Sequence, residues 1–254
     1  MKKIFFIIFI SITSQEKVIK VNAKISKKIG KQIYINECSG DLEKLVFWKQ
    51  GEDFVSVGIG HFIWCSKERC SFIDSFPELR AFLILNKIKI PKKFLDKSPW
   101  HSQEELKADI KGARKLRQLM ESTIDLQVKF MVSKLQTILP YMLRNIKGEE
   151  KQKHIKKQFC RMVNSGPAGI YALVDYTHFK GLGLQSQKEY KNKKWGLAQV
   201  LEDMKGNKIG ASAIAEFSKN AKRLIINRVK NAYRKEDQWL LGWLNRIETY
   251  NKFK

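Results

Sequence analysis

The sequence predicts an α+β protein that is mostly helical, with a small β-hairpin region near its N-terminus. Two observations carry this prediction. Residues 55–64 (VSVGIGHFIW) alternate in polarity and contain many β-branched and aromatic residues, which is typical of a strand or short hairpin. From Trp100 onward, apolar residues recur at helical spacing, and the 254 residues include only five prolines.

Local signals place the elements before Trp100 one by one. Residues 24–37 read as a basic helix that ends near Glu37. A second helix is expected to begin at the cap Ser39 and to end at Gly51, just before the hairpin. A short helix begins near Pro77, and 85–100 is expected to be a loop.

The chain after Trp100 reads as a series of helices. Ser102 and Glu105 form a capping-box pattern at the start of the first one. Two or three further helices are expected within 195–246. The residues that bound the helices in between are Pro140, Gly166, Pro167 and Gly181.

The first 23 residues predict a secretory signal peptide. Lys2 and Lys3 precede a short apolar run at 4–12, and small residues follow, with cleavage expected after Ser14 or near Ala23. The run is shorter than the ~20 residues that span a bilayer, and a retained N-terminal anchor is the alternative. We therefore expect a periplasmic or secreted protein, with residues 24–254 as one monomeric domain without a transmembrane span.

The chain is strongly basic, with a net charge of +24 from 49 basic and 25 acidic residues. A solvated lysine-rich surface explains part of this excess. A secreted protein of this charge is also attracted to polyanions, so we expect an anionic polysaccharide as partner. The sequence has no zinc-finger spacing, no RNP-like run and no basic helix with heptads, so no specific nucleic-acid partner is expected.

Four cysteines allow three disulfide pairings, among which the sequence does not choose. Cys65 and Cys70 are close enough in sequence to close a loop at the end of the hairpin, which leaves Cys38 and Cys160 as the second pair. A metal site is the alternative use of these residues. The sequence has no C-x-x-C spacing and its four histidines are scattered, so neither a metal nor another cofactor is expected.

Three carboxylates are candidates for acid–base chemistry. Glu37 lies where a helix should end, and partial burial there would raise its pKa, as a general acid requires. Glu52 and Asp53 lie in an exposed turn and would stay ionised, as the second group in glycoside hydrolysis does. The alternatives are a surface glutamate beside a turn and an ordinary acidic turn before a hairpin.

Further residues are candidates for substrate binding. Glycine inside a strand marks a bulge or a close approach, so Gly58, with Ser56 on the same side of the strand, is expected to line a cleft. His61 either contributes to this cleft or is a structural histidine. Asp175 and Lys180, at the end of an apolar helix, either form the far wall of the cleft or a set of salt bridges.

Glu37 and the segment 52–62 together resemble the active-site signature of phage-type lysozymes: a glutamate, an acid-containing turn, then T-I-G-x-G-H. This chain has S-V-G-I-G-H, with Ser56 at the threonine position and His61 in register. The alignment places Gln50 where the family has its second acid, so Glu52 corresponds to that acid only by proximity. The resemblance implies a lysozyme-like fold.

The whole chain also resembles a family of secreted proteobacterial proteins whose function is not settled. The segments that carry this likeness are GIGHFIW, DSFPEL, GIYALVDYTHFKG, WGLAQVLEDM and WLLGWLNRIETY.

The expected function is therefore a lysozyme-type glycoside hydrolase that cleaves β-1,4 bonds of peptidoglycan. Glu37 is the expected general acid, and Glu52 or Asp53 is the second carboxylate. A lytic transglycosylase, which needs one carboxylate, is an alternative, as is a non-catalytic, basic cell-wall-binding module. Retention or inversion at the sugar depends on the carboxyl separation, which the sequence does not supply.

Overall fold

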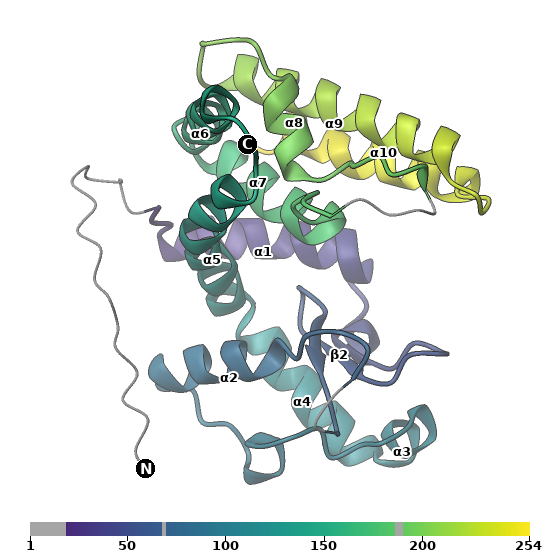
Figure 1. Cartoon of the computed structure of the whole chain (residues 1–254). Coiled ribbons are helices and arrows are strands. Elements are labelled where there is room, and N and C mark those ends of the chain that lie inside the picture. Colours follow the sequence, from purple (N-terminus) through teal and green to yellow (C-terminus); the bar gives the residue numbers. More distant parts are fainter. Residues whose placement is uncertain (1–18, 68–69, 186–189) are drawn as a thin grey trace, which may run out of the picture.

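The computed structural model describes residues 19–67, 70–185 and 190–254 of the chain (Figure 1). It is mostly helical with a small three-stranded antiparallel sheet, which confirms the predicted α+β class. Residues 1–18, most of the expected signal peptide, lie outside the described part. Within that part, none of the helices combines the length and apolarity that crossing a bilayer requires.

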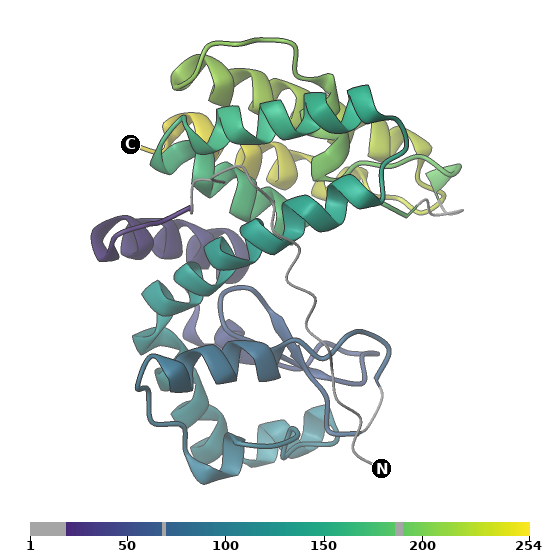
Figure 2. The same cartoon turned by 60° about the vertical axis from the view of Figure 1, so that its left-hand side comes forward.

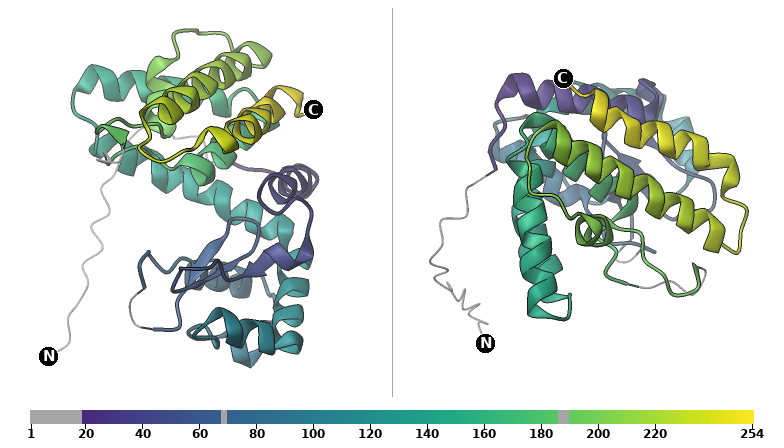
Figure 3. Two further views of the ribbon diagram at one scale, coloured as in Figure 1. Left: turned by 90° about the vertical axis from the view of Figure 1, so that its right-hand side faces the viewer. Right: turned by 90° about the horizontal axis from the view of Figure 1, so that it is seen from above.

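The molecule has a lower part around the sheet and a helical upper part, with α1 (Ala23–Cys38) and the long α5 (Ile124–Arg144) between them (Figures 1 and 2). The lower part comprises η1 (Leu42–Leu45), β1 (Val46–Phe47), β2 (Val55–Val57), β3 (Phe62–Trp64), α2 (Phe76–Leu85), η2 (Lys92–Phe94), α3 (Gln103–Ala108) and α4 (Ile110–Ser122). The upper part comprises α6 (Glu149–Val163), α7 (Pro167–Lys180), α8 (Leu197–Asp203), α9 (Ala211–Asn231) and α10 (Asp237–Lys252). Seen from above, α9 and α10 lie side by side (Figure 3).

Helix α1 brings Glu37 to the boundary between the two parts. The side chain of Asn22 caps the start of the helix by accepting the Ile25 amide. At the other end, Ser39 and Gly40 adopt left-handed conformations, and their amides donate to carbonyls of the last turn. The helix ends at Cys38, one residue later than expected, so Glu37 lies in its final turn.

The expected hairpin is confirmed as β2 and β3, and the sheet has the order β1-β2-β3. The helix predicted from Ser39 to residue 50 is wrong, because Ser39 ends α1 rather than starting a helix. Asp41 caps only the single turn η1. The next two residues, Val46 and Phe47, then pair with β2, because their apolar side chains suit a sheet surface.

Two details of the later helices also differ from the predictions. Pro140 does not end α5, which continues to Arg144. It lies in the last turns of the helix, where the buried Leu139 and Met142 on either side still pack into the core. The helix from Ser102 divides at Asp109, whose carboxylate accepts the Gly112 amide and so starts α4. The boundaries of α7 agree with the prediction, and three helices follow residue 195 as expected, although α10 continues beyond 246 to Lys252.

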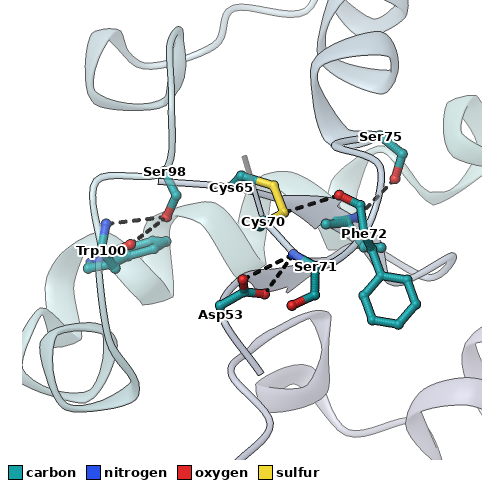
Figure 4. The surroundings of a disulfide bond; sticks show 9 residues. Asp53, Cys65, Cys70, Ser71, Phe72, Ser75, Ser98 and Trp100 are labelled. Carbon is teal, nitrogen blue, oxygen red and sulfur yellow. Dashed lines mark hydrogen bonds between the residues drawn. A yellow bond between two sulfur atoms is a disulfide. The ribbon is translucent and has the colours of Figure 1, made fainter. Parts of the chain in front are cut away.

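The disulfide between Cys65 and Cys70 is present, as expected, at the end of the hairpin (Figure 4). The carboxylate of Asp53 accepts the Ser71 amide at 3.0 and 3.2 Å, so it holds the chain beside this bridge. Cys38 is not bridged to Cys160. It is buried in the lower part, with its sulfur 3.7 Å from the Lys44 carbonyl oxygen.

We expect the double variant Cys65→Ser/Cys70→Ser to lose about 2 kcal/mol of unfolding free energy, because the bridge restricts a short loop in the unfolded chain. Urea denaturation measures this loss. Wild-type protein with a reductant should fall to the level of the variant, and the variant should not respond to the reductant. Equal midpoints for the oxidised wild type and the variant would contradict the expectation.

Candidate active site

A cavity of about 580 Å³ lies between the end of α1, the sheet region and helices α3 and α4. Two carboxylates, Glu37 and Glu43, line it. The aromatic side chains of Phe47 and Trp48 and the imidazole of His61 form another part of its wall. Of the sequence-predicted site residues, the structure therefore brings Glu37 and His61 together at one cavity.

Glu37 is held between two side chains and keeps 18% of its side-chain surface exposed. Nη2 of Arg246, from α10, donates a hydrogen bond to its Oε1. Nδ1 of His61 lies 3.8 Å from its Oε2, close enough for an electrostatic interaction but too far for a hydrogen bond. The Glu37 carboxylate is therefore held in position by Arg246 and is still accessible from the cavity, so it can contact a bound ligand.

Arg246 is itself fixed by Asp175, a residue of α7 that is completely buried. Nε and Nη2 of Arg246 each donate to the Asp175 carboxylate at 2.9 Å. Two further groups donate to the Asp175 carboxylate: the hydroxyl of Tyr250 at 2.7 Å and the side-chain amide of Asn36 at 3.1 Å. Burial alone would lower the pKa of Arg246, but the carboxylates of Asp175 and Glu37 outweigh burial and raise it. Asp175 thus acts on the cavity through Arg246 and does not line it.

His61 occupies the turn between β2 and β3 in a left-handed conformation (φ 47°), which is uncommon for a residue with a side chain. Burial lowers its pKa, and the charge of Glu37 only partly opposes this effect. The imidazole Nε2 lies 3.7 Å from the sulfur of Cys38. Burial raises the pKa of Cys38 to about 12, so this thiol stays protonated and is not a nucleophile.

Glu43 is the second carboxylate of the cavity, and the sequence analysis did not find it. Nη2 of Arg117, from α4, lies 2.9 Å from its Oε2, and the carboxylate side chain is 70% exposed. Arg117 also donates to the carbonyl oxygen of Val46 at 3.0 Å, so it ties α4 to the first strand. The sequence signal for Glu43 was its position six residues after Glu37, inside a segment that we had interpreted as a helix.

Glu52, Ser56 and Gly58 do not line this cavity. The Glu52 carboxylate lies 3.7 Å from Nζ of Lys49, in the turn before β2. Ser56 is only 6% exposed in the central strand. A Cβ atom at Gly58 would lie 2.4 Å from Oε1 of Gln127, so this glycine permits the close approach of α5 rather than of a sugar. Asp53, the alternative second acid, holds the Ser71 amide instead.

Two polar residues at the end of α7, His178 and Lys180, lie in different places. His178 lies against the β2–β3 turn, with its ring centre 6.0 Å from that of Phe62. Desolvation lowers the pKa of His178, and the charges of Glu37 and Asp175 partly oppose this shift. Lys180 lines a separate cavity of about 300 Å³ in the upper part.

The described residues contain no group of three or more His, Cys, Asp or Glu side chains that could hold a metal ion. Comparison of the chain with protein-family models, curated proteins and solved structures found no match. The class that can be stated from the fold and the site is thus an α+β protein with a carboxylate-lined cavity at the boundary of its two parts.

Proposed function

We propose that the protein is a secreted, lysozyme-type glycoside hydrolase that cleaves β-1,4 bonds of peptidoglycan, with Glu37 as the general acid. The observation that carries the proposal is the position of Glu37, in the last turn of α1, on the wall of a 580 Å³ cavity with a second carboxylate. This volume lies within the range of roughly 300–1,000 Å³ common for ligand sites.

In this mechanism Glu37 donates a proton to the glycosidic oxygen as the bond breaks. Asp175 offers Arg246 a second carboxylate, so the guanidinium can remain in place while Glu37 loses and regains its proton. Glu43, oriented by Arg117, is the candidate to stabilise the positive charge on the sugar or to activate water. It takes the role that the sequence analysis had given to Glu52.

The charge around the cavity supports an anionic substrate. Lys44, Lys107 and Arg114 line it together with the two carboxylates, and the whole chain carries a net charge of +24. Peptidoglycan carries carboxylates on its stem peptides, and on the lactyl groups of sugars without a peptide, and a basic protein is drawn to such a polymer. The strength of that attraction would fall with rising salt.

A lytic transglycosylase is the second candidate, and one observation favours it. Glu52 lies outside the cavity, and the carboxylate of Glu43 is engaged by Arg117. A transglycosylase needs only one carboxylate, because a hydroxyl of the sugar itself closes an anhydro ring. The hydrolase therefore needs the Glu43 carboxylate for catalysis, whereas the transglycosylase does not.

The test is to digest purified peptidoglycan with the wild type and with Glu37→Gln, Glu43→Gln and Glu52→Gln, and to identify soluble fragments by mass spectrometry. We expect Glu37→Gln to lose at least about 100-fold in rate, the low end for a general acid. Glu52→Gln, outside the cavity, is the matched control and should stay active.

The products separate the candidates. Reducing ends, together with a slow Glu43→Gln variant, support the hydrolase, and anhydro ends with an active Glu43→Gln variant indicate the transglycosylase. If no fragments form while the wild type still sediments with the wall, the proposal is rejected in favour of a non-catalytic binding module. Thermal unfolding of each variant checks that lost activity is not lost fold, since Glu37 also pairs with Arg246.

A further inference from the structure

The second cavity, of about 300 Å³, is lined by cations and lies apart from the Glu37 cavity. Lys180, Lys193, Lys194 and Arg228 contribute to its wall, and the backbone of 181–184 forms another side. Among the described residues that line it, none is acidic. Such a lining attracts an anion and repels a cation.

Lys180 is the central cation of this cavity. Its side chain is half-buried, and Nζ lies 3.5 Å from the ring centre of Trp243 and 4.0 Å from that of Phe179. Within the described part of the chain, its ammonium group makes no ion pair or hydrogen bond. Aromatic faces offset part of the cost of burying a cation, but they do not provide a counter-charge.

The two arginines closest to this arrangement are already neutralised. Arg228 donates to the fully buried carboxylate of Glu236 at 2.8 and 2.9 Å. Arg246, 4.3 Å from the Phe179 ring centre, is bound by the carboxylates described above. Glu236, Asp175 and Glu37 are therefore engaged by arginines, and among the residues that the structure describes no carboxylate pairs with Lys180.

We propose that this cavity binds a single oxyanion group, a carboxylate or a phosphate, with Lys180 as its counter-charge. The bound group would supply the negative charge that none of the described lining residues provides. Lys193 and Lys194 strengthen the attraction at the rim. This site does not depend on the chemistry of Glu37, because the two cavities are separate.

Binding should depend on pH. Burial and the charge of Arg228 lower the pKa of Lys180 to about 6, Arg246 acts in the same direction, and Glu236 and Glu37 oppose them. Only the protonated amine of Lys180 attracts the anion. Above this pKa the amine is mostly neutral, so it must take up a proton from solvent when the anion binds. The affinity should therefore rise as the pH falls from 8 toward 6.

The experiment is calorimetric titration of the full mature chain at pH 6 with N-acetylmuramic acid, N-acetylglucosamine and inorganic phosphate. N-Acetylglucosamine is the neutral control, since it lacks the lactyl carboxylate. Binding of N-acetylmuramic acid without binding of phosphate identifies a carboxylate site, and the reverse identifies a phosphate site. Lys180→Met should weaken the binding at least tenfold, whereas Lys191→Met, exposed and outside the cavity lining, should not change it.

Two results would overturn the proposal: no binding of either anion by the wild type, or equal affinity in Lys180→Met and the wild type. Loss of fold is not expected in Lys180→Met, because methionine keeps contact with the rings of Phe179 and Trp243 and removes a cation that no described carboxylate pairs with, and thermal unfolding verifies this. The Glu37→Gln variant should bind the anion normally. A failure of this proposal is thereby distinguishable from a failure of the proposed glycosidase.

Discussion

Replacing Asp175 with asparagine is expected to lower the free energy of unfolding by about 3–5 kcal/mol. The carboxylate is completely buried and accepts four hydrogen bonds, two of them from Arg246. Asparagine keeps the size of the side chain but removes its charge. The guanidinium, only 10% exposed, then retains Glu37 as its one counter-charge. Urea denaturation followed by circular dichroism measures the loss.

Asp125→Asn is the matched control for this prediction. Asp125 also pairs with a cation, Lys129, but at 4.0 Å and with both side chains about one third exposed to solvent. Such pairs contribute little, so its substitution should change stability by less than about 0.5 kcal/mol. If Asp175→Asn lowered the free energy of unfolding no more than Asp125→Asn does, the buried charge of Asp175 would not stabilise the fold.

Gly58→Ala is expected to cost about 2–5 kcal/mol of unfolding free energy, from two separate causes. The residue has φ 74°, where a side chain costs about 1–2 kcal/mol. The added Cβ would also press on the buried Gln127, which accepts the Ile59 amide and donates to the Met120 carbonyl oxygen. Disturbing such a buried network costs a further 1–3 kcal/mol or so. Chemical denaturation gives the total.

Gly51→Ala separates these two causes. Gly51 has a similar φ of 85°, but a Cβ there meets no atom within 4 Å. It should therefore show the backbone cost alone. A Gly58→Ala protein with wild-type stability but impaired binding to the wall polymer would instead restore the sequence-based role of Gly58 as a sugar contact.

The parts of the fold that the sequence predicted correctly have local causes. Pro167 and Gly181 bound α7 because one lacks an amide hydrogen and the other tolerates a positive φ. The hairpin followed from alternation over ten residues, and the position of Glu37 followed from the residues that end its helix. Each of these signals acts over a few neighbouring positions.

The parts that were missed depend on contacts between distant segments. Val46 and Phe47 form a strand because β2 lies beside them, and a helical pattern in the same residues gave no sign of this. Glu43 reaches the cavity because Arg117, 74 residues later, holds its turn in place. No local pattern links Glu37 to Arg246. For this reason the sequence pointed to Glu37 but not to Glu43, the second carboxylate that lines the cavity.

The sequence separation of 209 residues between Glu37 and Arg246 also bears on the order in which the site is assembled. During synthesis the helix with the acid appears early, and its arginine appears only with α10, close to the end of the described chain. A chain that lacks α10 contains the residues of the sheet and of the cavity wall, but its Glu37 has no Arg246 to pair with. The docking of α10 is thus the step that gives Glu37 its guanidinium partner.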